Sequence, residues 1–402
     1  MRLRRDGGHR GPFARLLGVR LLLDVQFWFP TWMIFLLGQG YSPLEAAAVD
    51  AVFHAALVIA EVPMGRVVDR IGRRRAMLAV CALTTVIFAG IGLVDSFWLM
   101  AVVWGVWGVL WALGSGLDTT YAWELAESRP GMIEPQRYLG WTRLAGGVAG
   151  LGSLLSAGLL LEIWPPLPYL VTSALGIAAL LLALSLPEVR PLAAASAHGG
   201  VTTLREALRI PAVRTGIALG AIVLTVGISI RILFQPLGLR LGMDPMGISV
   251  SYALIAVAVA IGGWLASRIG RRHRGRWVSA SIGLMAVSFL LVAPAMELDS
   301  SWLTMFVAIP LGAAAFGLGK TLTDIWLVES VGPHWRATVI SIASAANGLA
   351  MVAIRPAIVV ASDSTGIGST FLLWGAASVV LCVLSIVLLG RSDPSSARPP
   401  LT

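Results

Sequence analysis

The residues in this sequence that could do chemistry are mostly charged side chains placed within long apolar segments. Asp24, Arg231 and Arg355 are examples. Placing one charge at the centre of a membrane-spanning helix costs roughly 2.5–3.5 kcal/mol on insertion scales, so each such side chain needs a partner, a ligand or contact with water. The pattern therefore predicts the handling of ions or charged small molecules rather than the making and breaking of bonds.

Some of these charges have an obvious neighbour in the sequence and others have none. Asp24 follows Arg20 by one helical turn, so the two side chains can pair locally, and Arg143 is a second candidate partner for Asp24. Arg231 has no acid within a turn of it. It either contacts an anionic group or extends its guanidinium to lipid headgroups.

Further candidates lie toward the ends of apolar segments. Asp50 and His54 are one turn apart, and Arg355 lies in the second half of the chain. His54 could titrate near neutral pH, although a lone histidine on a helix more often packs or donates a hydrogen bond. Lys320 and Asp324 are four residues apart and predict a pair that neutralises itself.

Three tryptophans share one helical face. Trp104, Trp107 and Trp111 follow the spacing i, i+3, i+7. If this face lines a cavity, it favours an apolar or aromatic solute and attracts cations to the ring faces. The alternative is that it packs against other helices or lipid.

The sequence contains no constellation for bond chemistry. We find no cluster of His, Cys and Asp with metal-ligand spacing, no glycine-rich phosphate loop with a lysine, and no nucleophile elbow after a strand. Cys81 and Cys382 lie far apart within apolar segments and predict neither a disulfide framework nor a metal site. We therefore expect no enzyme, no metal and no cofactor, and no direct use of ATP.

The composition indicates which elements must position these side chains. Hydrophobic residues make up 57% of the chain and charged residues 13%, whereas an ordinary globular domain carries about 25% charged residues. Apolar segments of bilayer length must cross a membrane as helices, because the backbone has no water to bond there. We therefore expect an all-α polytopic membrane protein. Twelve segments are long enough: 16–37, 46–64, 76–94, 97–121, 138–161, 167–186, 213–236, 246–266, 277–296, 301–326, 337–361 and 369–390.

The arginines predict the orientation of these segments. They gather before the first segment, between the second and third, in the middle of the chain and after the eighth, whereas the opposite loops hold mostly acids and one cation, Arg240. By the positive-inside rule both termini are cytoplasmic. The net charge of +9 then reflects topology and anionic lipid headgroups rather than nucleic acid. The first apolar run is too long, and lacks a cleavage site, for a removed signal peptide.

The chain repeats itself at an offset near 200 residues. Three stretches match in register: residues 65–74 with 263–272, residues 114–123 with 317–326, and residues 40–43 with 242–245. In the last match Ser42 and Asp244 are expected N-caps, each followed by a proline at the first helical position.

The duplication predicts two six-helix bundles with pseudo-two-fold symmetry, which is a transporter architecture. We place the N-terminal bundle at 1–186 and the C-terminal bundle at 213–402. Residues 187–212 are expected to form a cytoplasmic linker with a short amphipathic helix.

These motifs resemble the major facilitator superfamily over nearly the whole chain. Residues 65–75, GRVVDRIGRRR, resemble its signature loop, and EVPMG at 61–65 is similar to a bacterial branch whose second span ends Glu-x-Pro-x-Gly. RATVISI at 336–342, and Tyr121 with Glu124 at the end of span four, also resemble that branch. The resemblance implies a secondary transporter in which two bundles rock about a central site.

The resemblance also implies a role for the signature loop. The candidate gating residues are Gly65, Asp69, Arg70, Gly72, Arg73, Glu124 and Arg336. Asp69 is expected to face the positive N-terminus of span eleven, which opens at Arg336, and so to hold the two halves in the outward-facing state. Arg70 or Arg73 is expected to pair with Glu124, and Gly65 and Gly72 to permit close approach and a tight turn. The alternative is a loop that only determines topology.

Spans one and seven line the cavity in resembling proteins. Asp24 is therefore a candidate for binding a proton or a cationic substrate, with a purely structural pair as the alternative, and Arg231 is a candidate for an anionic group. Spans two and eleven face each other in the superfamily, so Asp50 and Arg355 are candidates for an outer gate. The alternative is an inert pair of boundary charges.

The branch and the apolar cavity candidates favour efflux of a small, partly hydrophobic compound, driven by a proton gradient across a bacterial plasma membrane. We expect a monomer whose partners are the substrate, the lipid bilayer and protons. Some family features are missing: Ser267 stands where the first half has Asp69, span four lacks a buried arginine, and span five lacks a Gly-Pro pair. Two alternative functions stay open: import of a small metabolite, such as an anion that binds Arg231, and a non-transporting membrane sensor.

Overall fold

The computed structural model describes residues 11–128, 135–189, 209–298, 300–331 and 336–391. Within these ranges the regular elements are all helices. The helices form two compact units, Met1–Ser196 and Ala197–Thr402. The division falls inside the segment 187–212, which the sequence predicts to be a linker, and the amphipathic helix expected there lies outside the described residues.

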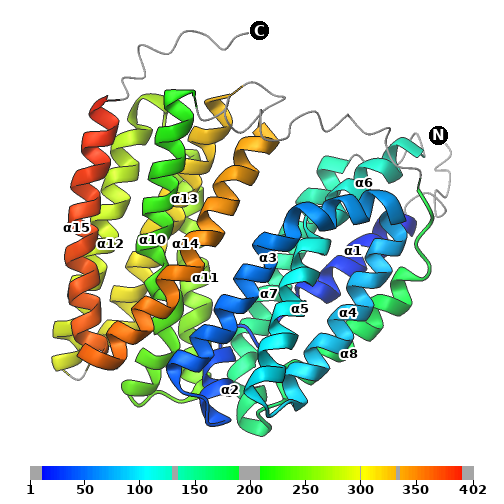
Figure 1. The fold of residues 1–402 in the computed structure, drawn as a ribbon, viewed down its shortest axis with the longest axis horizontal. Coiled ribbons are helices and arrows are strands. Elements are labelled where there is room, and N and C mark those ends of the chain that lie inside the picture. The colour runs from blue at the N-terminus through cyan, green and yellow to red at the C-terminus, as the bar shows by residue number, and fades with distance from the viewer. Residues whose placement is uncertain (1–10, 129–134, 190–208, 299, 332–335, 392–402) are drawn as a thin grey trace, which may run out of the picture. The chain divides into compact units, whose positions relative to one another are not determined.

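The N-terminal unit places long helices side by side, with α4 next to α8 and α3 next to α5 (Figure 1). Its helices are α1 (Gly11–Asp24), α2 (Trp32–Gly38), α3 (Pro43–Ile71), α4 (Arg73–Leu93), α5 (Phe97–Gly114), α6 (Leu117–Ser128), α7 (Pro135–Ile163) and α8 (Leu167–Ala183).

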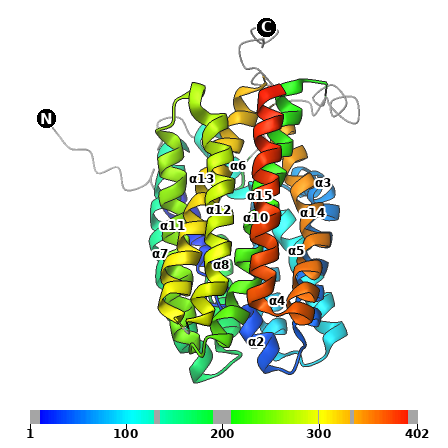
Figure 2. The ribbon, with the colours of Figure 1, turned by 90° about the vertical axis from the view of Figure 1, so that its left-hand side faces the viewer.

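The C-terminal unit is a second bundle, whose long helices lie side by side with their axes roughly aligned (Figure 2). Its helices are α10 (Pro211–Arg240), α11 (Pro245–Ser267), the short η1 (Arg271–His273), α12 (Arg274–Glu297), the π-helix η2 (Leu303–Ala308), α13 (Ile309–Glu329), α14 (Arg336–Thr365) and α15 (Ile367–Arg391).

Corresponding helices make corresponding contacts within each unit. In the first unit α3 packs on α5 and α4 on α8, and in the second α11 packs on α13 and α12 on α15. The matching stretches 65–74 and 263–272 lie at the same places, where α3 meets α4 and where α11 approaches α12. The two units therefore share this order of helix contacts.

Glycines let these paired helices approach closely. A Cβ on Gly108 of α5 would lie 3.0 Å from the Leu57 nitrogen and 3.1 Å from the Ala56 Cβ of α3. In the second unit a Cβ on Gly262 of α11 would lie 2.8 Å from the Leu318 nitrogen of α13. Small residues at such crossings are the usual means of packing helices tightly within a membrane.

The predicted N-caps are confirmed. Ser42 and Glu45 form a reciprocal capping box at the start of α3, with Pro43 at its first position. The Asp244 carboxylate accepts a hydrogen bond of 2.7 Å from the Gly247 amide at the start of α11. Each cap satisfies backbone N–H groups that have no partner within the helix.

Two predicted spans are not single helices. The segment 16–37 breaks after Asp24 and resumes as α2 at Trp32, because Pro30 lacks an amide hydrogen and restricts the residue before it. The segment 97–121 breaks at Ser115–Gly116, where Gly116 has a φ of 67°. Only glycine adopts this left-handed conformation without strain, so it ends α5 and allows α6 to start in a new direction.

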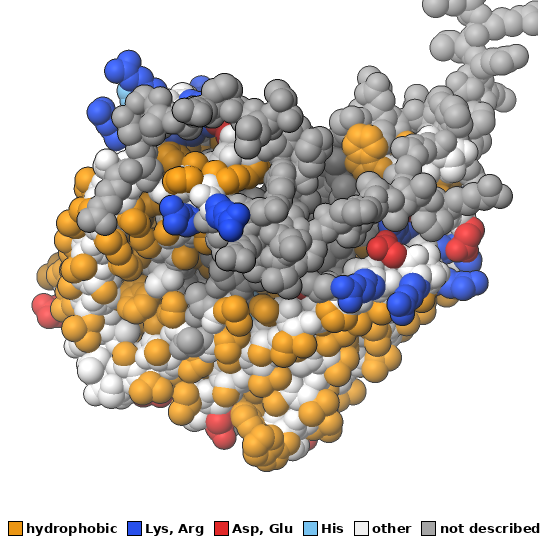
Figure 3. All heavy atoms as spheres, turned by 45° about the horizontal axis from the view of Figure 1, so that its top comes forward, with side chains coloured by type: hydrophobic (Ala, Val, Ile, Leu, Met, Phe, Trp, Pro, Cys, Tyr) orange, Lys and Arg blue, Asp and Glu red, His pale blue; other side chains and the backbone are white. Residues whose placement is uncertain are grey.

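Nine helical stretches among the described residues are long and apolar enough to cross a membrane. The broken first segment is not among them, and α8 is a shorter apolar helix of the same kind. Large hydrophobic side chains are exposed on the surface, such as Trp98 at 77% and Val380 at 67%. Figure 3 shows this hydrophobic surface, with Lys and Arg side chains gathered in a few groups. The protein is a multi-pass membrane protein.

The crossing of α3 and α5 offers a test of this packing. We expect Gly108→Val to lower the free energy of unfolding by about 1–3 kcal/mol, the usual cost of overpacking, since its side chain would meet the backbone of α3. Gly152→Val is the matched control, because a Cβ at Gly152 of α7 has open space around it. Thermal unfolding of the purified protein in detergent measures both variants. Equal melting temperatures for the two would contradict the close approach.

Candidate functional site

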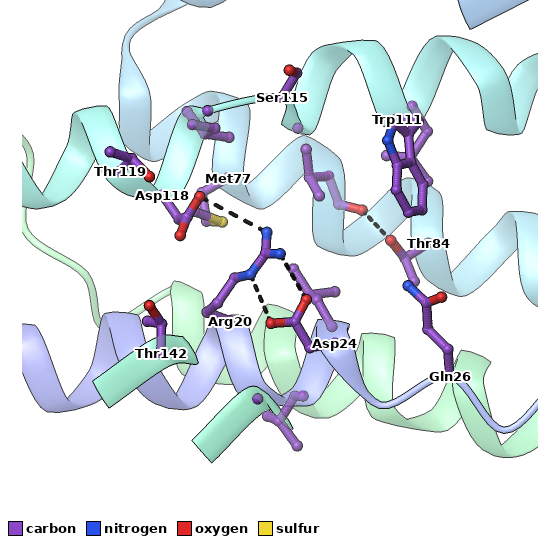
Figure 4. A pocket seen from close by; sticks show the side chains of 18 of the residues that line it. Arg20, Asp24, Gln26, Met77, Thr84, Trp111, Ser115, Asp118, Thr119 and Thr142 are labelled. Carbon is purple, nitrogen blue, oxygen red and sulfur yellow. Dashed lines mark hydrogen bonds and ion pairs between the residues drawn. The ribbon is translucent and has the colours of Figure 1, made fainter. Parts of the chain in front are cut away.

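The N-terminal unit contains a partly open cavity of about 530 Å³. Its walls come from α1, α4, α5, α6, α7 and α8. Figure 4 shows a charged group at one end, formed by Arg20, Asp24 and Asp118, and Trp111 with Thr84 and Gln26 at the other end. The cavity therefore offers a charged region and an aromatic region to one solute.

Arg20 lies between two carboxylates at the charged end. Its Nε donates to Asp24 Oδ2 at 2.9 Å, and its Nη2 lies 2.7 Å from Asp24 Oδ1. The Nη1 atom of the same guanidinium lies 3.8 Å from Asp118 Oδ1. One positive and two negative side chains thus leave an excess of one negative charge among the described residues that line the cavity.

Local structure explains how these charges come together. Arg20 and Asp24 are four residues apart in α1, so they lie on one face and pair bidentately. Asp118 is in the first turn of α6, where a carboxylate is favoured by the positive end of the helix. A Cβ on Gly146 of α7 would lie 3.2 Å from Asp24 Oδ2, so this glycine leaves room for the carboxylate.

The three tryptophans of the predicted helical face have different roles: some line the cavity and one packs in the core. Trp107 and Trp111 line the cavity, and the side chain of Trp111 is 47% exposed. Trp104 is buried at 1% and packs against Trp32 at 5.3 Å between ring centroids. Trp107 also stands edge-on to Trp28 at 4.7 Å, which anchors the aromatic wall in the core of the unit.

The signature loop forms a second charged group. Arg73 Nη1 donates to Asp69 at 2.8 Å, and Arg73 Nε donates to Glu124 Oε1 at 3.0 Å. The expected pair with Glu124 is therefore present, and Arg73 makes it, whereas Arg70 is exposed. The Glu124 side chain is fully buried, with Arg73 at 11% exposed and Asp69 at 66%.

The two glycines of the loop have different roles. Gly72 has a φ of 88° and ends α3 directly before α4, so it forms the tight turn. Gly65 lies inside α3 in open space, so the expectation that it also permits close backbone approach has no support within the unit.

The residues that follow α8 form hydrogen bonds beside this loop. Arg74 donates to the backbone oxygens of Leu186 and Leu184, both at 2.8 Å, and Tyr121 of α6 donates to the backbone oxygen of Pro187. Arg74 Nη1 also lies 3.8 Å from Glu188 Oε2. These contacts anchor the start of the segment 187–212 on the N-terminal unit.

The C-terminal unit repeats part of this arrangement. Arg274 and Arg271 reach Glu329 at the end of α13, with N–O distances of 2.5 Å and 3.6 Å. Ser267, at the position matching Asp69, donates its hydroxyl to the backbone oxygen of Trp264 instead. The expected pair of Lys320 with Asp324 is present at 2.5 Å.

The remaining candidates lie in different units or outside the described residues. Asp50 is buried in α3, 3.9 Å from His54 Nε2, and Arg355 is buried in α14 of the other unit, so their contact as an outer gate stays a prediction. The side chains of Arg231, Arg336 and Arg143 lie outside the described residues.

Asp118 is the site residue that the sequence did not reveal. Asp118 lies within a predicted span. A charge inside a span needs a partner or contact with water, and this requirement could have marked Asp118 as a candidate. Its partner Arg20 is far away in sequence, so only the fold could identify the contact. Among the described residues no group of three His, Cys, Asp or Glu side chains could hold a metal ion.

Comparison of the sequence with known proteins identifies a family. Residues 21–354 match a sequence model of the Major Facilitator Superfamily. No curated protein matches the sequence.

Several solved structures share the fold. The nucleoside transporter NupG is 15% identical, with a TM-score of 0.73 over 94% of this chain and 98% of that chain. A D-xylose–proton symporter is 16% identical, with a TM-score of 0.71 over 93% and 95%. A bacterial homologue of the human lysosomal transporter Spinster, in an inward-facing and unoccupied conformation, is 15% identical, with a TM-score of 0.73 over 98% and 100%. At these identities the likeness shows the fold alone.

The buried Glu124 offers a test of the signature-loop group. We expect Arg73→Met to lower the free energy of unfolding by about 3–5 kcal/mol, because the buried carboxylate would lose its partner. The double variant Arg73→Met/Glu124→Gln should regain most of this loss, and Arg70→Met, on an exposed side chain, should have little effect. Chemical denaturation monitored by tryptophan fluorescence measures all three. An Arg73→Met protein as stable as Arg70→Met would contradict the pair.

Proposed function

This chain belongs to the major facilitator superfamily, and we propose that it exports small, partly hydrophobic organic cations in exchange for protons. Family membership makes it a transporter of small molecules rather than an enzyme. The single observation that carries the choice of substrate is the cavity of the N-terminal unit, which combines excess negative charge with an aromatic wall.

The charge of the cavity favours a cation over an anion. Arg20 is neutralised by Asp24 through two short contacts, which leaves Asp118 only a looser contact with the same guanidinium at 3.8 Å. Among the described lining residues the negative charge in excess can be balanced by a proton or by a substrate cation. Arg231, the candidate for an anionic solute, lies outside the described residues.

The aromatic wall suits the apolar part of such a substrate. Trp107 and Trp111 line the cavity with Phe88 and Leu110. Indole faces attract cations as well as apolar groups, and an exposed ring such as Trp111 can contact a solute without rearranging the core.

Proton coupling is assigned to the same charged group. A cation and a proton would compete for Asp24 and Asp118. A cation bound from the cytoplasm would be displaced by a proton that enters from outside the cell, which is the exchange that an antiporter performs. Asp24 is the one carboxylate of α1 and holds Arg20 through two short contacts, so it is our first candidate for the exchanged proton.

Alternating access completes the proposal. We propose that the two units rock about the cavity, with Asp69 holding the outward-facing state against the start of α14 at Arg336 and with Asp50 and Arg355 closing the outer side. The arginine distribution supports cytoplasmic termini. We place the protein in a bacterial plasma membrane, as a monomer of twelve spans in which two pseudo-symmetric bundles, 1–186 and 213–402, flank the linker 187–212.

Accumulation of a fluorescent hydrophobic cation in cells that make the protein tests this function. We expect cells with the wild-type protein to accumulate less dye than cells without it, and a protonophore to remove the difference. Asp24→Asn should also remove it, because the carboxylate that binds the proton or the cation is lost. Dye levels that are equal with and without the protein would refute export of cations and direct the search to import and to anionic metabolites.

The aromatic wall predicts a separate effect on affinity. We expect Trp111→Ala to weaken binding of the same cation roughly tenfold, since a partly desolvated contact with an indole face is worth about 1–2 kcal/mol. Trp98→Ala is the matched control on the same helix, because Trp98 is 77% exposed on the flank and does not line the cavity. Quenching of the dye by purified protein measures both dissociation constants. Equal constants would show that the wall does not contact the cation.

A further inference from the structure

The two charged groups of the N-terminal unit have the same design. In each, one arginine lies between a carboxylate four residues away on its own part of the chain and a second carboxylate supplied by α6. The cavity group is Arg20 with Asp24 and Asp118, and the loop group is Arg73 with Asp69 and Glu124. The short helix α6 therefore joins the cavity to the signature loop.

α6 is a short helix that a break in the backbone divides from α5. It contains only 12 residues and is divided from α5 by Ser115 and Gly116, where the backbone takes a left-handed conformation. Asp118 is in its first turn, and Glu124 follows less than two turns later. A displacement of one carboxylate along this helix must therefore displace the other.

The contacts of Arg20 are unequal in a way that permits an exchange. Its guanidinium holds Asp24 at hydrogen-bond distance, whereas Asp118 lies 3.8 Å away. A hydrogen-bonded pair with Asp118 requires an approach of only about 1 Å, since charge-assisted bonds have lengths near 2.8 Å. Loss of the charge on Asp24 would remove the competing attraction.

Other polar groups around the cluster do not supply a competing charge. From α7 the Tyr138 hydroxyl is buried, has no hydrogen-bond partner among the described residues, and interacts electrostatically with Asp118 and Arg20. The lining residues contributed by α4 and α8 carry no titratable group: Met77, Val80, Thr84, Phe88 and Thr172. The Arg143 side chain of α7 lies outside the described residues.

We propose that α6 is a lever that transmits the charge state of the cavity to the signature loop. When a proton or an organic cation neutralises Asp24, Arg20 moves to Asp118, α6 follows, and Glu124 separates from Arg73. The ligand in this scheme rests on the proposed function, whereas the movement of α6 depends only on the charge of Asp24. In this scheme Asp118 and Arg20, besides lining the cavity, act on the loop through α6.

The contact of Glu124 with Arg73 is sensitive to a movement of α6. Its side chain is fully buried, and its Oε2 atom has no hydrogen-bond partner among the described residues, so Arg73 supplies its neutralising contact through Oε1 alone. A small shift of α6 would lengthen that single bond. The Asp69 carboxylate is 66% exposed and stays available to Arg73 afterwards.

Hydrogen–deuterium exchange of the full-length protein in nanodiscs tests the lever at one pH. Asp24→Asn represents the neutralised cavity, and we expect the peptides covering 117–128 and the start of α4 to exchange roughly threefold faster than in the wild type, as in a local opening. The double variant Asp24→Asn/Asp118→Asn should exchange like Asp118→Asn alone, because Arg20 then has no carboxylate to move to. Asp324→Asn is the matched control, since it removes a carboxylate from an i, i+4 pair in the other unit.

Two results would overturn the lever. The first is unchanged exchange of 117–128 in Asp24→Asn, and the second is a double variant that exchanges as fast as Asp24→Asn. The readout does not require transport. A protein that fails to export the dye but shows the Asp24→Asn response would refute the proposed function and keep the lever, and the opposite result would refute the lever alone.

Discussion

A guanidinium held inside an apolar bundle must be neutralised where it lies, and much of the N-terminal unit is organised by that requirement. Arg20 and Arg73 are each balanced by a nearby carboxylate on the same part of the chain and by a distant one on α6. The ion pair with the nearby carboxylate needs only helical spacing, so this pair forms wherever the helix forms. The distant one requires α6 to lie against both α1 and α4. The position of α6 is therefore the constraint on which both charged groups depend.

The other features of the unit make that position possible. Gly116 ends α5 so that α6 can turn away, and Gly72 ends α3 so that Arg73 begins α4 beside Glu124. Gly146 leaves space for the Asp24 carboxylate. Behind these contacts, Trp28, Trp104 and Trp107 pack edge to face in a rigid aromatic core. The cavity thus lies between a packed aromatic wall and the charged group of Arg20, Asp24 and Asp118. The negative charge in excess in this group favours contact with water or a ligand.

Contacts within one helical turn could be predicted from the sequence, and contacts across the fold could not. The pairs Arg20–Asp24 and Lys320–Asp324 and the caps at Ser42 and Asp244 follow from spacing alone. The resemblance to a family narrowed the partners of Glu124 to Arg70 or Arg73, and the structure selects Arg73. The contact of Arg20 with Asp118 has no signal in the spacing, because it depends on the break at Gly116. Hydropathy does not detect that break, since Ser115 and Gly116 interrupt an apolar run without adding charge.

The two units match in sequence at three stretches, but they differ in how their charges are paired. The second unit keeps the arginines after α11 and an acid at the foot of α13, as Arg271, Arg274 and Glu329 show. However, Ser267 replaces the acid that would complete the loop group, and Lys320 is satisfied by Asp324 on its own helix. The Lys320–Asp324 pair is closed within one helix, whereas Arg20 and Arg73 in the first unit and Arg274 in the second each connect two helices. The charges that line the cavity, Arg20, Asp24 and Asp118, all belong to the N-terminal unit, and our proposal therefore assigns the exchange of charge during transport to that unit.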